Sequence, residues 1–237
     1  MELTLAESLL LLAFDDEKGK DTTSAGIAGG LAGALLIDLS RRGCVSDEGG
    51  DLAAADCPDP GHPLLGAAHE VIRASGKPRD AKGWVGRLPK EFKPLRECVA
   101  RYLVERGVLS EEEHKVLGLV PTTRFPVRDP SPEQALRSRL EAVLLSERAP
   151  SEEDAVLVAL LAPYDLVKRL VPKERRKEAR RQAKAIADGG IAGDAVARSV
   201  RDVEAAVLAG VLAGVVASSA SSGDGGGGGD GGGGGGS

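Results

Sequence analysis

Histidines are the side chains in this sequence best suited to acid–base chemistry near neutral pH. The chain has three of them, His62, His69 and His114. None lies in a recognisable nucleophile motif such as Gly-x-Ser-x-Gly, and no partner base or orienting group accompanies them. We interpret them as surface or helix-capping residues, and we predict that the protein is not an enzyme.

Metal binding is the next chemistry that the side chains could support. Cys44, Cys57, His62 and His69 could ligate zinc, but their spacing is irregular and lacks a Cys-x₂₋₄-Cys pair. The acidic run 15–17 lacks the alternation of ligands found in a calcium loop. We therefore predict neither a metal nor a cofactor.

The cysteines also bear on the cellular compartment. Cys44, Cys57 and Cys98 are odd in number and follow no disulfide pattern, which favours reduced thiols in a cytosol. The N-terminus has no basic region and no small-residue cleavage site, so no signal peptide is predicted. The expected location is the cytoplasm.

A glycine-rich apolar segment, 22–43, reads "TTSAGIAGGLAGALLIDLSRRG". Its glycines match neither the P-loop pattern nor the Gly-x-Gly-x-x-Gly dinucleotide pattern. The apolar run from Ala25 to Ile37 reaches only about 20 Å as a helix, too short to cross roughly 30 Å of hydrocarbon. The segment is predicted to be a helix buried in the core of a globular domain, with Gly43 ending it.

Charge argues against nucleic acid as a partner. The net charge is −5, and a fragment that resembles a winged helix carries Glu111, Glu112 and Glu113 where DNA phosphates would repel them. One segment is strongly basic, "KERRKEARRQAK" at 173–184. It is either a solvated helix face or a surface that attracts anionic membranes.

The remaining pattern predicts a mostly α-helical single domain over 1–217, followed by a disordered Gly/Ser/Asp tail over 218–237. Two small β-hairpins are expected, one turning at 48–50 and one turning at 121–123, and Ser110 with Glu113 is expected to cap a short turn. Helices are expected over 5–14 (opened by a Thr4/Glu7 capping box), 24–42, 64–75, 93–106, 131–147, 151–162, 173–184 and 194–216.

Several of these segments together resemble the Golgi phosphoprotein 3 family. The quoted stretches are "LTLAESLLLLAFDDEKG", "GIAGGLAGALLIDLSRRG", "LVERGVL", "TTRFPVRDPSPEQALRSRLEAVL" and "DAVLVALL", in that order. The resemblance covers roughly residues 3–216. It implies a helical domain around a hydrophobic central helix, in agreement with the buried helix predicted from the glycine-rich segment.

The resemblance also implies a function. Eukaryotic members are non-enzymatic peripheral membrane adaptors that bind phosphatidylinositol 4-phosphate and the cytosolic tails of Golgi glycosyltransferases. They grip the lipid headgroup with an aromatic residue and several basic residues, because phosphates need charge-assisted donors. The expected partners of this chain are anionic lipid headgroups and cytosolic tails of membrane proteins, with a homo-oligomer left open. Its Ala-, Gly- and Arg-rich composition favours a bacterial source.

Only some of the family's headgroup-binding residues have an equivalent of the same type in this sequence. The family's basic pair falls on Arg137 and Arg139, which are expected to bind the headgroup. Its tryptophan falls on Thr23 and its arginine in the central helix falls on Ala32, so half of the pocket is replaced by small residues. Further arginines that could complete a headgroup site are Arg41, Arg42, Arg124 and Arg128. The alternative function is a cytosolic protein-interaction adaptor without headgroup specificity.

Overall fold

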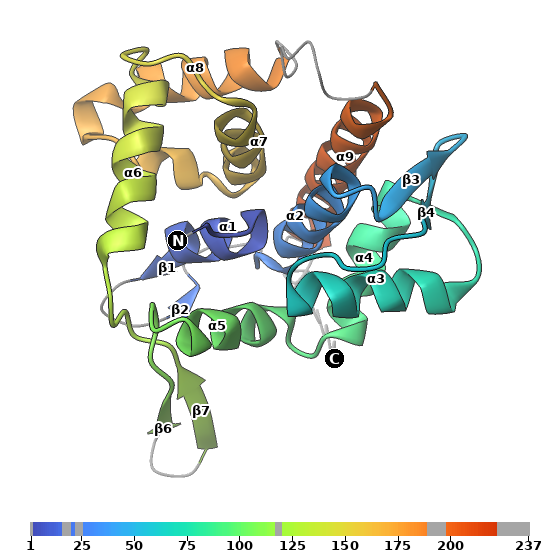
Figure 1. Ribbon diagram of the computed structural model, residues 1–237. Coiled ribbons are helices and arrows are strands. Elements are labelled where there is room, and N and C mark those ends of the chain that lie inside the picture. The colour runs from blue at the N-terminus through green and yellow to red at the C-terminus, as the bar shows by residue number, and fades with distance from the viewer. Residues whose placement is uncertain (1, 16–19, 22–25, 117–119, 189–197, 222–237) are drawn as a thin grey trace, which may run out of the picture.

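The computed structural model describes residues 2–15, 20–21, 26–116, 120–188 and 198–221. Helices dominate, as predicted (Figure 1). They are α1 Leu5–Ala13, α2 Ala28–Arg41, α3 Pro63–Ser75, α4 Ala81–Glu91, α5 Leu95–Glu105, α6 Ser131–Leu144, α7 Glu152–Leu161, α8 Arg176–Asp188 and α9 Arg198–Ser221, with 3₁₀ turns η1 Ala162–Tyr164, η2 Leu166–Arg169 and η3 Lys173–Arg175.

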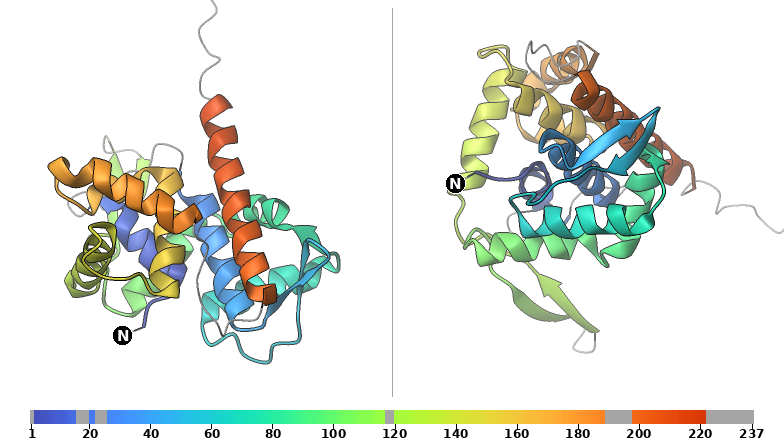
Figure 2. Two further views of the ribbon diagram at one scale, coloured as in Figure 1. Left: turned by 90° about the horizontal axis from the view of Figure 1, so that it is seen from above. Right: turned by 45° about the vertical axis from the view of Figure 1, so that its right-hand side comes forward.

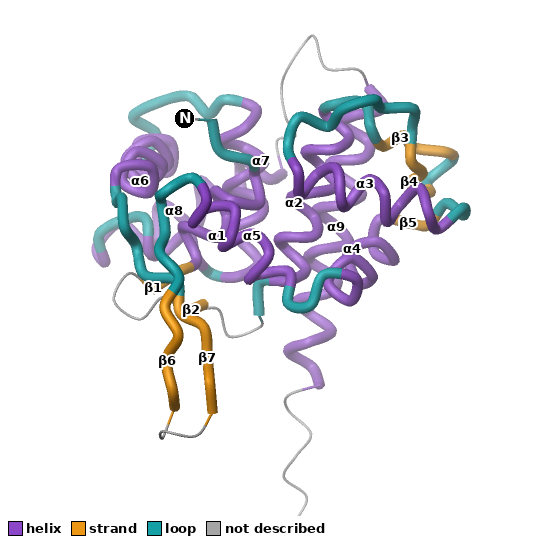
Figure 3. The backbone as a smooth tube through the Cα atoms, turned by 60° about the horizontal axis from the view of Figure 1, so that its bottom comes forward, coloured by secondary structure: helices purple, strands orange, loops and turns teal. Residues whose placement is uncertain are grey.

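The strands form small antiparallel sheets. Strands β1 Phe14–Asp15 and β2 Lys20–Asp21 pair with each other, and β3 Val45–Glu48, β4 Asp51–Ala54 and β5 Arg79–Asp80 form a sheet in that order. The hairpin of β6 Glu112–Val116 and β7 Val120–Arg124 projects from the body, on the side where α9 also extends (Figure 3).

Helices α1 and α2 form the centre of the domain. The predicted capping box opens α1, because the Thr4 hydroxyl accepts from the Glu7 N–H while the Glu7 carboxylate accepts from the Thr4 N–H. Asp38 of α2 then accepts a 2.9 Å hydrogen bond from the N–H of Leu5. A polar contact thus joins two helices whose side chains are otherwise almost wholly apolar and buried.

The predicted burial of the glycine-rich helix is confirmed, and one glycine shows why a small residue is needed there. A Cβ added at Gly33 would lie 2.5 Å from a methyl carbon of Val211 and 3.2 Å from one of Val207, both on α9. Glycine therefore lets α9 pack directly on α2. The helix ends as expected, with Gly43 in the left-handed conformation at φ +70°. Within the described ranges, no helix is long and apolar enough to span a bilayer.

Three details of the predicted secondary structure were wrong. The second hairpin exists, but Pro121–Thr123 belongs to β7 and therefore does not form its turn. Ser110 and Glu113 do not cap a helical turn, since β6 begins at Glu112. Helix α4 was not predicted, and it carries Trp84, whose indole N–H donates a 2.8 Å hydrogen bond to the carbonyl of Leu52.

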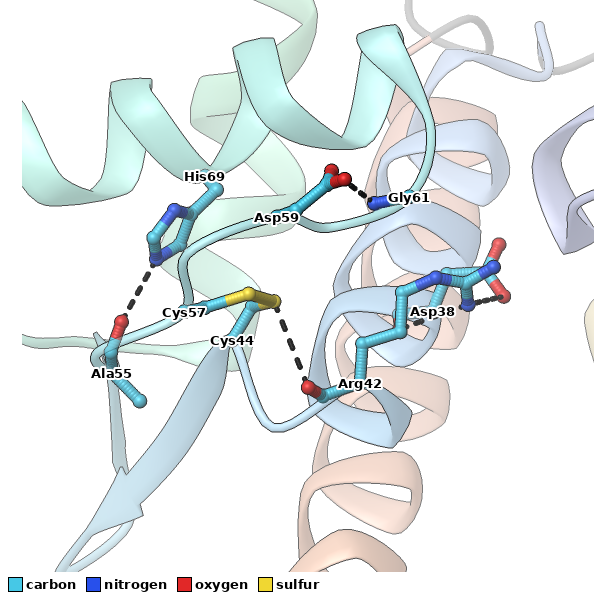
Figure 4. The surroundings of a disulfide bond; sticks show 8 residues. All are labelled: Asp38, Arg42, Cys44, Ala55, Cys57, Asp59, Gly61 and His69. Carbon is cyan, nitrogen blue, oxygen red and sulfur yellow. Dashed lines mark hydrogen bonds and ion pairs between the residues drawn. A yellow bond between two sulfur atoms is a disulfide. The ribbon is translucent and has the colours of Figure 1, made fainter.

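The prediction of three reduced cysteines was also wrong. Cys44 and Cys57 form a disulfide, with their Cα atoms 4.8 Å apart (Figure 4). The β3–β4 hairpin brings the two residues together, because Cys44 precedes β3 and the N–H of Ala55, just after β4, donates to the carbonyl of Cys44. The disulfide therefore closes a hairpin, and Cys98 remains a free thiol.

Candidate functional site

Helix α6 carries the two arginines expected to bind a headgroup, but it directs them to different partners. Successive residues of an α-helix are rotated by about 100°, so residues two positions apart point to opposite sides. The Nε of Arg137 lies 2.5 Å from Oε1 of Glu133, one turn earlier on the helix, and its Nη1 lies 3.4 Å from the carbonyl of Arg169. Arg137 therefore joins α6 to η2.

Arg139 faces the beginning of α7. Its Nη2 lies 2.8 Å from a carboxylate oxygen of Glu153, and its Nε lies 2.9 Å from Oδ1 of the fully buried Asp154. The second oxygen of Asp154 lies 3.4 Å from Nη2 of Arg148. Arg139 thus takes part in an ion-pair network between α6 and α7, and the structure does not bring it together with Arg137.

A cavity of about 340 Å³ lies beside Arg139. Leu3 and Leu136 form part of its apolar wall, while Ser8 and Glu153 form part of its polar wall. Ser8 is buried, and its hydroxyl has no hydrogen-bond partner within the described part of the chain. An anion entering this cavity would meet the guanidinium of Arg139, and it would have to displace or share the carboxylate of Glu153.

The arginines at the end of α2 also have acidic partners. The Nε of Arg41 lies 2.6 Å from Glu204 of α9, and Nη1 of Arg42 lies 3.7 Å from Asp38. Burial raises the pKa of Asp38 to about 6, against the opposing effects of the Leu5 N–H and the charge of Arg42. Arg41 therefore joins α2 to α9, whereas Arg42 pairs within the end of α2.

Arg124 and Arg128 lie on either side of the short segment that leads from β7 towards α6. Arg124 is half-buried, and its Nε is buried with no hydrogen-bond partner among the described residues. Arg128 is exposed, and its backbone N–H donates to the carbonyl of Val108. No contact joins either side chain to Arg137 or Arg139 in the described part of the chain.

The basic segment that was predicted as a helix forms η3 and α8. Three of its seven basic residues are engaged: Arg175 pairs with Glu178, Arg180 pairs with Asp165, and Arg176 donates to the carbonyl of Lys168. The other four are exposed and form no ion pair within the described residues. We call them the basic face of α8, which consists of Lys177, Arg181 and Lys184 of α8 together with Lys173 of the preceding turn η3.

Helical spacing explains why three of these residues, which lie on α8 itself, share a face. Lys177, Arg181 and Lys184 are separated by four and three positions, so about 100° of rotation per residue places them within one quadrant of the helix, while Lys173 lies in the preceding turn η3. The buried residues Ala179 and Ala183 hold another side of α8 against the body. The three cations of α8 therefore project together towards solvent.

The family model described as Golgi phosphoprotein 3 matches residues 5–207, which is most of the described helical body. The chain belongs to the Golgi phosphoprotein 3 family.

In this Golgi phosphoprotein 3 domain, the expected headgroup positions are Thr23, Ala32, Arg137 and Arg139. Ala32 is fully buried in the middle of α2 and contributes to the core, so it makes no polar contact. Thr23 lies outside the described residues. Arg137 and Arg139 are present and half-buried, but each is paired with a carboxylate.

The acidic partners of Arg139 were not predicted. Glu153 and Asp154 are fourteen and fifteen residues beyond Arg139, and only the return of α7 against α6 brings them close. The sequence signal that could have indicated the pairing is the acidic first turn of α7, placed one short loop after a helix that carries arginines. A pattern of that kind predicts a neighbouring cation without saying which one.

Proposed function

We propose that this domain is a non-enzymatic module that binds anionic lipid headgroups, of the phosphatidylinositol 4-phosphate type, at a membrane surface. Membership of the Golgi phosphoprotein 3 family supports this proposal. The observation that carries it is the basic face of α8, where three exposed cations lie on one side of the helix and Lys173 of η3 precedes them. Each basic residue near an anionic surface contributes about 1 kcal/mol of attraction.

Arg139 is the candidate for contact with an individual headgroup. It is half-buried and lines the cavity formed by α1, α6 and α7. Its guanidinium could hold two phosphate oxygens at once after displacing the carboxylate of Glu153. Arg137 would act on its own side of α6, so the two would not share one phosphate. In this proposal the basic face of α8 supplies long-range attraction and Arg139 supplies local contact.

Co-sedimentation with vesicles tests the proposal. Vesicles containing phosphatidylinositol 4-phosphate are compared with phosphatidylserine vesicles of matched charge across a salt series. Replacing Lys177 and Lys184 with Gln should weaken binding roughly thirtyfold at low salt, since two contributions of about 1 kcal/mol are lost. The matched control replaces Lys77 and Lys90, which are exposed elsewhere and change the net charge equally.

The outcomes separate the two parts of the site. Equal weakening by the control pair would contradict a role for the basic face of α8. Preference for the phosphoinositide that disappears in Arg139→Gln would support the cavity beside Arg139. Charge-matched binding that fades with salt would support α8 alone.

The second candidate function is a protein-interaction adaptor without lipid specificity. The pairing of Arg137 and Arg139 with carboxylates favours it, because neither guanidinium is free to receive a phosphate without breaking an ion pair. Absence of binding to both kinds of vesicle, together with recovery of a partner in a membrane-free pull-down, would support this function over the first.

A further inference from the structure

A groove lies between α9, α4 and the beginning of α2, away from the cavity beside Arg139. Its volume is about 300 Å³, and its surface is mainly apolar. Val85 and Pro89 contribute from α4, and Val211 and Val215 contribute from α9. This volume is at the lower end of the range for small-ligand sites.

Two glycines leave the groove open. A Cβ added at Gly86 of α4 or at Gly214 of α9 would meet no atom within 4 Å, although both residues line the groove. Gly210, one turn before Gly214, is different, since a Cβ there would lie 3.0 Å from the backbone nitrogen of Lys82. The helices are therefore in tight contact at Gly210 and separate beyond it.

The wall contributed by α9 continues the face that packs in the core. Val203, Val207 and Val211 are almost completely buried, and Gly214 and Ser218 follow at helical spacing on the same side. Figure 2 shows this part of α9 projecting beyond the rest of the body. From Gly210 to Ser218 the groove runs for about 12 Å along the helix, at 1.5 Å per residue.

Charge is confined to one place on the groove. Lys82 is the charged residue among those that line it, is exposed, and forms no ion pair within the described part of the chain. An elongated apolar groove with a cation at its rim complements a single hydrocarbon chain that ends in an anionic group. The surface of the groove is too small to hold a stable protein dimer together, because such a dimer buries about 800 Å² on each partner.

We propose that this groove binds the acyl chain of an anionic lipid, with Lys82 facing its charged end. The inference rests on the proposed function and adds that part of the lipid leaves the bilayer and packs along α9. Burial of methylene groups would supply most of the affinity. Binding should therefore depend on chain length more steeply than on the nature of the anionic group.

The first measurement uses medium-chain alkanoates, from octanoate to tetradecanoate, with the full-length protein and no membrane. Affinity measured by calorimetry should rise about fourfold for each methylene added until the groove is filled. Trp84 gives an independent signal, because it is the single tryptophan and precedes Val85 of the groove. A chain brominated along its length should quench its fluorescence. Affinity that does not change with chain length would overturn the proposal.

The second measurement fills the groove. Gly86→Leu and Gly214→Leu should each lower alkanoate affinity at least tenfold, and both should fold, since neither site is crowded and leucine favours a helix over glycine. The matched control is Gly66→Leu on α3, which is equally open and lines no part of this groove. Unchanged affinity in both groove variants, with folding verified by circular dichroism, would overturn the proposal.

Lys82→Gln tests the charged end. It should weaken alkanoate binding about tenfold and leave binding of the neutral alkanol of the same length unchanged. Equal weakening of both ligands would contradict the assigned role of Lys82. If the wild type self-associated without binding any alkanoate, and Gly214→Leu abolished the self-association, the occupant of the groove would be a second copy of this chain and not an acyl chain.

Vesicle sedimentation of the same variants separates this inference from the proposed function. Salt-dependent vesicle binding without alkanoate binding would overturn the groove and leave the proposed function standing. Alkanoate binding without vesicle binding would support the groove as a site for free anionic amphiphiles and contradict the membrane role.

Discussion

Glu7 accepts hydrogen bonds of 2.8 and 3.0 Å from one nitrogen of Arg106, which lies 99 residues farther along the chain. The carboxylate of Glu7 is fully buried, and Nε2 of His62 lies 3.5 Å from its Oε1. Burial alone would raise the pKa of Glu7, but the hydrogen bonds from His62 and Thr4 and the charge of Arg106 outweigh it and lower the pKa. This contact holds α1 against the end of α5.

Arg106→Met should lower the free energy of unfolding by about 3 kcal/mol, because it leaves a buried carboxylate without its main counter-charge. Urea unfolding at neutral pH measures the change. Arg101→Met is the control, since its pair with Glu111 is exposed and should cost less than about 1 kcal/mol. Because the folded pKa of Glu7 lies below its ordinary value of 4.5, the stabilisation is present above 4.5 and is lost as the pH falls through the folded value.

Asp38 should show the opposite dependence on pH. Burial raises its pKa from 3.8 to about 6, so between these values the folded protein binds a proton that the unfolded chain does not. Its contribution to stability should therefore increase as the pH falls from about 6 towards 3.8, by at most about 3 kcal/mol. Unfolding of the wild type and of Asp38→Asn is compared across that range. Parallel stability curves for the two proteins would contradict the prediction.

Replacing Gly33 and Gly66 by alanine should change the free energy of unfolding in opposite directions. Gly33→Ala places a methyl group 2.5 Å from Val211 and should destabilise the protein by about 2 kcal/mol, since α9 must move away from α2. Gly66→Ala meets no atom within 4 Å and should stabilise by about 0.5–1 kcal/mol through helix propensity. Thermal unfolding measures both. Equal effects would show that the contact between α2 and α9 is not tight at Gly33.

Reduction of the disulfide between Cys44 and Cys57 should lower the free energy of unfolding by about 3 kcal/mol, as expected for a loop of 13 residues. The measurement is urea unfolding with and without a strong reductant. In Cys57→Ser the reductant should have no effect, because the remaining thiols cannot form this bond. A reductant effect that persists in the variant would assign it to another cause.

Most helices could be predicted because their apolar residues repeat at helical spacing and their ends carry clear caps. Thr4 with Glu7 and Ser151 with Asp154 both form capping boxes in the structure. Helix α4 escaped prediction because Gly83, Gly86 and Pro89 all disfavour a helix interior. Packing supplies what local propensity lacks there, since Trp84 and Leu88 are fully buried against the core.

The candidate site was harder to predict than the fold. Helical geometry alone shows that Arg137 and Arg139 point apart, but their partners depend on how α6 meets η2 and α7. The acyl-chain groove depends on where α9 and α4 separate, between Gly210 and Gly214. Such distances between helices come from the three-dimensional packing and have no local signature in the chain.

Because Gly33 packs against Val207 and Val211, the core around α2 can be completed only after α9 has been synthesised. Helix α2 (Ala28–Arg41) is synthesised well before α9 (Arg198–Ser221), which covers it. At 5–20 residues per second, one face of the central helix has no native cover for roughly ten to thirty seconds. A nascent chain in that interval presents an apolar, glycine-rich surface of the kind that chaperones bind, and a chain truncated before α9 would keep it.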